Sequence, residues 1–180
     1  MKDYEMAISL YQATVPSYIQ ILNSMLHLVG KAEAYCAEEG LQADDILKAC
    51  LADDMLPFAY QVKSTTVHSI GAINALHGGV FSPDMNPPPS SFEALKAQLN
   101  TTLAALDELV PEDLNVFVGR DMAFQFGERR MEFTAEEFLL SFSQPNFYFH
   151  ATTAYDILRH KGLAIGKRDF VGAVRIKAAT

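Results

Sequence analysis

The sequence predicts an all-α protein, a four-helix bundle with a short β-hairpin inserted between the third and fourth helices. Two observations predict this fold class. Long segments carry apolar residues at steps of three and four, the period of an amphipathic helix. One segment, 115–133, instead alternates apolar and polar residues with the period of a strand. Because 180 residues suffice for one hydrophobic core, we expect a single domain over residues 1–180.

The first helix is expected from about Tyr4 to Glu39, where the apolar residues recur at helical steps. Gly40 follows in the position that ends many helices, since glycine accepts the left-handed backbone conformation. Pro16 lies inside this segment and predicts a bend, because proline cannot donate a helical hydrogen bond.

The second long helix is expected from Pro57, which suits a first helical turn, to His77, before the glycine pair at 78–79. A short helix precedes it, because the acidic pair at 44–45 is typical of a helix start and an apolar run leads on to Leu51.

The third helix is expected after an extended crossover at 81–89, a segment that contains four prolines. Ser90 and Glu93 have the spacing of a capping box, which predicts the start of the helix. Leucines at helical steps follow, and the helix should end before Pro111.

The predicted hairpin begins with the alternating residues Val116 and Val118 and turns near the pair Gly127-Glu128. Thr134 and Glu137 then have the spacing of a second capping box, which predicts the start of the fourth helix.

The fourth helix should run to about Lys161, with an interruption near Pro145 and a stop at Gly162. In the tail that follows, Phe170 and Val171 are expected to dock on the body of the protein.

Composition excludes several functional classes. The chain has 49% hydrophobic and 20% charged residues, and no apolar stretch approaches the roughly 20 residues that span a bilayer, so we expect no membrane partner. A net charge of −8 repels nucleic acid. The N-terminus lacks the features of a signal peptide, which predicts a cytoplasmic location. Cys36 and Cys50 are therefore expected to be free thiols.

The most informative segment is PNFYFHATTAYDILRHKG at 145–162, followed by IGKRDFVG at 165–172. This run resembles the C-terminal signature of a bacterial family of unknown function in the DinB/YfiT-like superfamily of helical bundles. The resemblance covers nearly the whole chain. It implies a DinB-like four-helix bundle and a homodimer.

The resemblance also implies a place for a divalent metal, because DinB-like proteins commonly hold one with a histidine of the second helix and two of the fourth. His68 and His150 match two of these ligands. The residues four positions from His150 are Asn146 and Ala154, neither of which suits nickel or zinc there. We therefore expect no tightly bound cofactor. A weak nickel or zinc site at the two histidines is the alternative.

A small-molecule pocket between the second and fourth helices is the other expectation. Its candidate residues are His68, Gln61, Asn146, His150, Tyr155 and Arg159. Two alternatives stay open. The small residues near His68 also suit close helix packing, and Arg159 also suits an ion pair with an acid such as Asp53, Asp54 or Asp156.

The sequence offers no nucleophile elbow and no phosphate-binding glycine loop. The function it favours is that of a DinB-like protein that binds a small molecule or has a structural role, without catalysis. A metal-dependent enzyme resembling the thiol-dependent transferases and isomerases of the superfamily is the first alternative. A protein-interaction module is the second.

Overall fold

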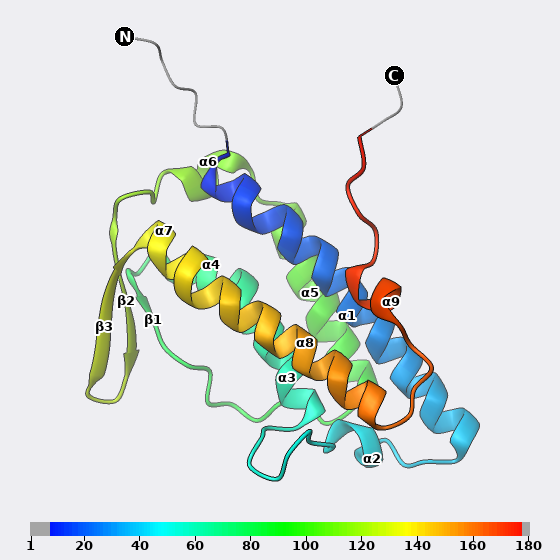
Figure 1. The fold of residues 1–180 in the computed structure, drawn as a ribbon. Coiled ribbons are helices and arrows are strands. Elements are labelled where there is room, and N and C mark those ends of the chain that lie inside the picture. Colours follow the sequence, from blue (N-terminus) through cyan, green and yellow to red (C-terminus); the bar gives the residue numbers. More distant parts are fainter. Residues whose placement is uncertain (1–7, 178–180) are drawn as a thin grey trace.

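Four long helical segments form the bundle in the computed structural model, which describes residues 8–177 (Figure 1). The first is α1 (Leu10–Glu39) and the third is α5 (Phe92–Asp107). The second and fourth each contain a π-helical stretch between two α-helical ones. α1 packs along α5, and α3 (Phe58–Thr66) packs along α8 (Gln144–His160). The predicted all-α bundle is confirmed.

α1 begins and ends with side-chain and backbone signals that the sequence carries. The Ser9 hydroxyl accepts a hydrogen bond from the Gln12 N–H at 3.2 Å, and the Gln12 side chain accepts one from the Ser9 N–H at 3.0 Å. Gly40 ends the helix with φ +66°. The predicted start at Tyr4 lies outside the described residues. α1 continues through Pro16, whose carbonyl accepts a hydrogen bond from Arg175 at 2.8 Å.

The second helical segment consists of α3, a π-helical stretch η1 (Val67–Gly71) and α4 (Ala72–Ala75). Pro57 is the residue just before α3. The short helix α2 (Asp44–Leu47) precedes the whole segment. The segment ends slightly before the predicted His77. A π-helix widens the turn by one residue, so it shifts which side chains face the partner helix.

The start of α5 corrects the prediction by one residue. The hydroxyl of Ser91, and not that of Ser90, accepts a hydrogen bond from the Ala94 N–H at 3.1 Å. Two neighbouring serines present the same capping side chain, so composition alone cannot choose between them. After α5, Pro111 occupies the first turn of a separate short helix, α6 (Pro111–Asn115).

A three-stranded sheet lies at one end of the bundle (Figure 1). The predicted hairpin is present as β2 (Asp121–Phe126) and β3 (Arg129–Thr134), which pair antiparallel across a two-residue loop. Its first loop residue is Gly127, at φ +58°, where glycine suits the turn. The two-residue strand β1 (Val80–Phe81) adds a third strand, parallel to β2. The sequence predicted an extended chain there, but no pairing.

Val116 and Val118 do not belong to the hairpin. Both lie in the turn after α6 and are exposed. The strands begin only at β2, where burial does not alternate: Met122 and Ala123 are both buried and Phe124 is half-buried. Two valines two residues apart also occur in irregular turns, and this is why the prediction began the hairpin too early.

The fourth helical segment consists of α7 (Ala135–Glu137), the π-helical η2 (Phe138–Ser143) and α8. The Thr134 hydroxyl caps it by accepting a hydrogen bond from the Glu137 N–H at 3.4 Å. The predicted interruption takes the form of η2, which comes directly before Pro145 in the first turn of α8. The chain turns away at Gly162, with φ +95°.

The C-terminal tail docks on the body of the protein, as predicted, and its contacts are with α1 and α8. The tail contains a short helix, α9 (Lys167–Val171), beside α1 (Figure 1). The Phe170 ring packs against Tyr155 at 5.8 Å, and the Val171 carbonyl accepts a hydrogen bond from Gln20 at 2.8 Å. Cys36 and Cys50 are free thiols, and burial raises the pKa of Cys36.

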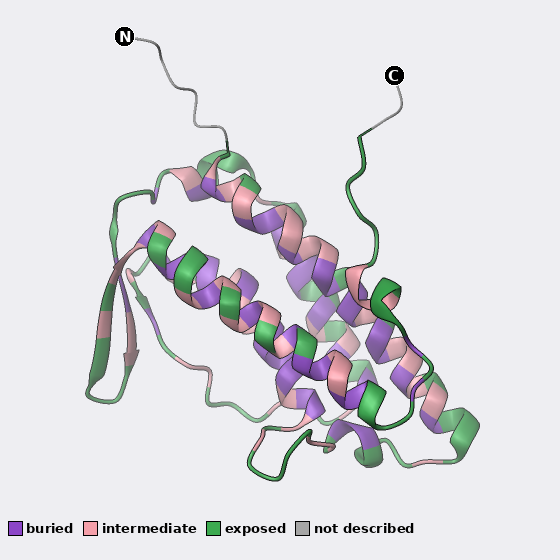
Figure 2. Cartoon of the chain, in the orientation of Figure 1, coloured by how far each residue is buried: buried purple, intermediate pink, exposed green. Residues whose placement is uncertain are grey.

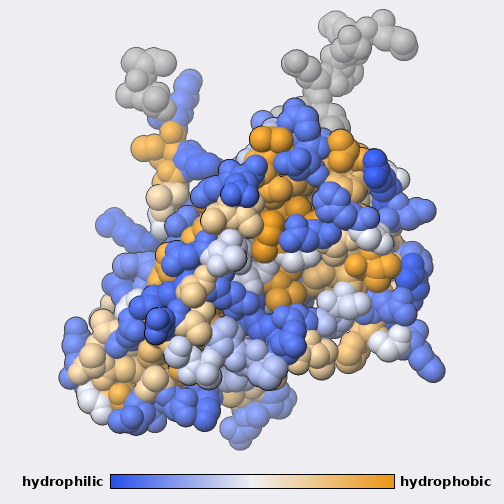
Figure 3. All heavy atoms as spheres, turned by 180° about the vertical axis from the view of Figure 1, so that it is seen from behind, coloured by the Kyte–Doolittle hydropathy of each residue, from blue (hydrophilic) through white to orange (hydrophobic). Residues whose placement is uncertain are grey.

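The core lies between the inward faces of the long helices, whose outward faces are exposed (Figure 2). Its largest fully buried side chains include Tyr18, Phe58, Phe138 and Phe147. Seen from behind, the surface shows hydrophobic side chains gathered in several places among hydrophilic ones (Figure 3). Within residues 8–177, no helix has the length and apolar character needed to cross a membrane.

Candidate functional site

The site forms where the two π-helical stretches meet the packed pair α3 and α8. His68 lies in η1 and His150 lies in α8, and their rings stack with centroids 5.7 Å apart and planes 20° apart. Both side chains are half-buried. We call these two residues the histidine pair. π-helical turns are frequent at functional sites, because the wider turn redirects a side chain that an α-helix would place elsewhere.

His150 is held in one tautomer by Gln61. The Gln61 side-chain NH2 donates to the Leu56 carbonyl at 2.8 Å, and this bond directs the Gln61 oxygen toward His150. Nδ1 of His150 lies 2.7 Å from that oxygen. An amide oxygen only accepts hydrogen bonds, so Nδ1 carries the proton and Nε2 of the neutral ring carries a lone pair.

His68 is held in the same tautomer by Ser143. The Ser143 hydroxyl donates its only hydrogen to the His68 carbonyl at 3.1 Å. Nδ1 of His68 lies 3.2 Å from the same hydroxyl oxygen, which accepts from Nδ1–H when the hydroxyl hydrogen is on the carbonyl. Among the described residues, no side chain or backbone group is hydrogen-bonded to Nε2 of either histidine. The pair thus presents two unshared Nε2 lone pairs.

Both rings are neutral near pH 7. Burial lowers the pKa of His68 to about 4, and the neighbouring His150 lowers it further as a second cause. Burial alone lowers the pKa of His150 to about 4. The physical reason is that an imidazolium loses hydration in the helix interface and gains no carboxylate in exchange. The histidine pair therefore accepts hydrogen bonds rather than binding anions.

Aromatic rings surround the pair. Tyr60 lies 6.1 Å from His150, Phe81 lies 5.3 Å from His68, and Phe142 lies 6.2 Å from His68, all between ring centroids. These residues come from α3, β1 and η2, which explains how the small sheet contributes to the site. The surroundings suit a flat apolar group better than a hydrated ion.

A buried lysine fixes the crossover loop next to this site. Lys63 is 3% exposed and its ammonium lies 3.0 Å from the Asp84 carboxylate. It also donates to the backbone carbonyls of Asp84 and Asn86. Burial raises the pKa of Asp84, but hydrogen bonds from Asn86 and Lys63 outweigh burial and lower it. We call this contact the lysine anchor.

Three of the predicted site residues lie away from the pair or have side chains that are already hydrogen-bonded to backbone carbonyls. Tyr155 packs on Phe170 of the tail, because five residues from His150 correspond to about 140° around the helix. Arg159 forms no ion pair with a described acid and instead donates to the carbonyls of Leu163 and Ile165 at 3.2 and 2.8 Å. Asn146 lies one turn from His150, but its amide donates to the Phe142 carbonyl at 2.7 Å.

The residues do not fit a tightly held metal. Within residues 8–177, no group of three or more histidine, cysteine, aspartate or glutamate side chains could hold a metal ion. The position that would supply a third ligand from α8 is Asn146, whose amide is already bonded, or Ala154. Transition-metal sites in proteins usually take at least three protein ligands.

Sequence reasoning missed Ser143, Tyr60 and the lysine anchor. Ser143 faces His68 because η2 shifts the register of the fourth helix, and no sequence signal for a π-helix was available. Lys63 was passed over because a lysine in a polar stretch usually lies on the surface. The run of prolines after Phe81 was the one available hint that the crossover loop needs a fixed position.

The family is shown by comparison with known proteins. The family model described as Domain of unknown function (DUF1993) matches residues 10–171. The chain belongs to the DUF1993 family. Curated proteins give no match.

A solved structure supports the same conclusion for the DUF1993 chain. The crystal structure of a DinB family member protein from Shewanella denitrificans has a TM-score of 0.77 and 27% sequence identity, over 94% of this chain and 96% of that chain. The DUF1993 fold is therefore DinB-like. The predicted DinB-like family of unknown function and the predicted bundle are both confirmed.

Proposed function

We propose that this DinB-like protein binds a small molecule at the histidine pair and that it does so without catalysis. One observation carries the proposal. His68 and His150 are neutral, lie side by side and are locked with Nδ1–H directed into the protein, which leaves two Nε2 acceptors without a partner among residues 8–177. Acceptors in such a setting favour a ligand that supplies hydrogen-bond donors.

The ligand chemistry follows from the surroundings. A flat, uncharged molecule with an O–H or N–H group can donate to one Nε2 while its apolar part contacts Tyr60, Phe81 or Phe142. A carboxylate or phosphate lacks a cationic partner here, since both imidazoles are neutral. Two hollows lie elsewhere on the surface and neither contains the histidine pair, so we expect the ligand at the pair to be small.

Phenol is a suitable first probe, because it combines one O–H donor with one flat ring. Calorimetric titration of the protein with phenol should give saturable binding with one phenol per chain. Because phenol has a single O–H donor, at least one of His68→Leu and His150→Leu should weaken binding about tenfold, the loss expected for one buried hydrogen bond. His160→Leu, at the exposed end of α8, is the matched control and should bind as the wild type does.

Toluene separates hydrogen bonding from simple apolar contact. It has nearly the same shape as phenol but no donor, so it should bind at least tenfold more weakly. Equal binding of toluene and phenol, or binding by both His68→Leu and His150→Leu that equals binding by His160→Leu, would reject the histidine pair as the ligand site.

We also propose that no transition metal is tightly bound. The two-histidine donor set supports this, because water would have to fill at least two positions around nickel or zinc. Metal analysis after dialysis against a chelator should find less than a tenth of an equivalent per chain. Stoichiometric nickel or zinc that is lost in His150→Ala would favour the metal-dependent enzyme instead.

A cytoplasmic, bacterial homodimer completes the proposal. The net charge of −8 disfavours nucleic acid as a partner. Exposed apolar side chains along the fourth helical segment support a second subunit as the partner. Leu140 is 41% exposed and Phe149 is 56% exposed. Side chains of this kind are typical of a surface that a second subunit covers.

A further inference from the structure

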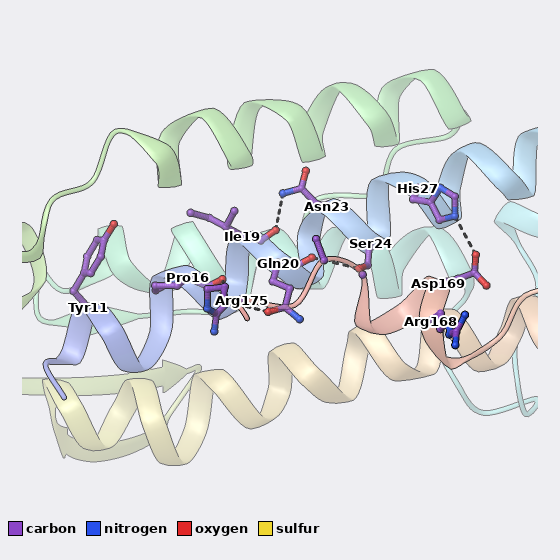
Figure 4. Close-up of a pocket in the computed structure, with 12 residues that line it drawn as sticks. Tyr11, Pro16, Ile19, Gln20, Asn23, Ser24, His27, Arg168, Asp169 and Arg175 are labelled. Atoms are coloured by element: carbon purple, nitrogen blue, oxygen red, sulfur yellow. Dashed lines mark hydrogen bonds and ion pairs between the residues drawn. The ribbon is translucent and has the colours of Figure 1, made fainter. Parts of the chain in front are cut away.

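A long groove runs along α1 on the side of the C-terminal tail, away from the histidine pair (Figure 4). Its volume is about 640 Å³, within the range of small-molecule sites. Lining residues extend from Tyr11 to His27 of α1, a span of about 24 Å along a helix that rises 1.5 Å per residue.

The tail forms one wall of the groove and is fixed by hydrogen bonds to α1 and by a close approach at Gly172. Arg175 donates at 2.8 Å to both the Pro16 carbonyl and the Gln20 side chain. Gly172 passes so close to α1 that a Cβ atom there would collide with the Ser24 hydroxyl, and its φ is +63°. Only glycine suits this position. The groove therefore depends on the tail, which these contacts hold in a fixed position against α1.

The two ends of the groove differ in chemistry. Tyr11, Pro16 and Ile19 line one end, where the Arg175 guanidinium is already bonded to the Pro16 carbonyl and to Gln20. His27, Asp169 and Arg168 lie together at the other end (Figure 4). A molecule that fills the groove would therefore need an apolar body and a polar head.

The charges at the polar end decide the sign of that head. The Asp169 carboxylate is already paired, because it accepts from the Gly166 N–H at 2.8 Å, from Lys31 at 2.9 Å and from His27 at 3.1 Å. These contacts hold its pKa well below the ordinary value. Arg168 is exposed and has no acceptor among the described residues. An unpaired guanidinium attracts an anion locally, although the net charge of the chain is −8.

We propose that this groove binds an amphipathic anion, a molecule with an unbranched apolar chain and a carboxylate head. The carboxylate lies at Arg168, and the chain runs along Ile19 and Pro16 toward Tyr11. The site is separate from the histidine pair, so the two ligands bind without competing.

Decanoate and decylammonium are matched probes, with the same chain and opposite charge. Calorimetric titration of the whole protein below the micelle concentration should show one decanoate bound per chain, and no saturable binding of decylammonium. Arg168→Gln should weaken decanoate binding about fivefold, the effect of losing one exposed ion pair. Ile19→Asp should weaken it more than tenfold, because it places an acid in the path of the chain.

Arg129→Gln, on the distant hairpin, is the control and should leave decanoate binding unchanged. Circular dichroism of each variant checks that it is folded. Equal affinity for decylammonium, or equal affinity of the Arg168→Gln and Arg129→Gln variants for decanoate, would overturn the proposal. It would also fail if Ile19→Asp converted a dimer to a monomer, since the groove would then be an interface between copies.

Discussion

His68 and His150 each determine the charge and the hydrogen-bonding character of the site. Each ring is neutral because it is buried without a carboxylate, and each is oriented by one partner, Ser143 or Gln61. This arrangement has a cost that can be measured. Protonation in the folded state must overcome burial, so acid should destabilise the protein through these two residues.

The free energy of unfolding should fall between pH 6.5 and pH 4. In the folded state the pKa of each histidine is about 4, below its ordinary value, so the unfolded chain binds more protons across this range. Stability therefore rises with pH in this window and is complete above it. From pH 7 to pH 5 each histidine should account for a loss of about 2 kcal/mol. Urea unfolding at several pH values measures it.

The control is a comparison of variants over the same pH range. A His68→Asn/His150→Asn double variant should lose most of this acid sensitivity, because asparagine does not titrate. His160→Asn, which changes an exposed residue, should behave as the wild type. An unchanged pH slope in the double variant would contradict the account.

Several of the site residues could be predicted from the sequence, and the reason is geometric. Gln61 and His68 share one helix face, and His150 is the one histidine in the middle of the fourth helix, so helical periodicity brings them together. Tyr155 lies away from the histidine pair, against Phe170, because five residues do not return to the same face of a helix. Ser143 was missed because its position depends on the π-helical register of η2.

At the scale of elements, the lysine anchor fixes the proline-rich loop at 82–89. Lys63→Met removes the ammonium that holds the Asp84 carboxylate and two backbone carbonyls. We expect a loss of about 2 kcal/mol in the free energy of unfolding, less than for a fully buried pair because Asp84 is 32% exposed.

Hydrogen exchange should locate that effect. Amides at 82–90 should exchange faster in the Lys63→Met variant, by more than the loss of global stability explains. Amides in the middle of α1 should change only by the amount that this global loss explains. Lys48→Met, which removes only an exposed pair with Asp44, is the control. Equal loop exchange in the two variants would show that the anchor does not hold the loop.

The start of α5 gives a second test at this scale. Ser91→Ala should cost about 1 kcal/mol, because it removes the acceptor for the Ala94 N–H. Ser90→Ala, one residue earlier, should change stability by less than about 0.3 kcal/mol, as is typical of an exposed site without such a contact. Thermal unfolding of the two variants compares them directly. The reverse order would support the capping box predicted from the sequence.

The start or end of an element was predictable where a single capping residue determines it. It was not predictable where the element depends on pairing with another strand. Gly40, Thr134 and Gly162 each act through their own backbone or side chain, and each ends or starts a helix as predicted. β1 has two residues and exists only because β2 lies beside it. Two residues carry no period, so a strand of that length leaves no pattern in the sequence.

At the scale of the whole molecule, a helical bundle was predictable because four long amphipathic segments leave few other ways to bury their apolar faces. Its DinB-like form was predictable only from the resemblance to a known family. Light scattering at tens of micromolar should give twice the mass of one chain if the proposed homodimer forms. Phe149→Asp, on the exposed face of α8, should then shift the mass toward one chain without loss of helix content. A wild-type protein that scatters only as a monomer would reject the dimer.

The central claim of the account is that both histidines are locked with Nδ1 protonated and Nε2 free. Long-range ¹H–¹⁵N NMR of histidine-labelled protein at pH 7 tests it directly, since the two ring nitrogens of a neutral imidazole have separate signals. The account predicts the Nδ1–H tautomer for His68 and His150, and its loss at His150 alone in Gln61→Leu. A protonated Nε2 at either histidine in the wild type would contradict it.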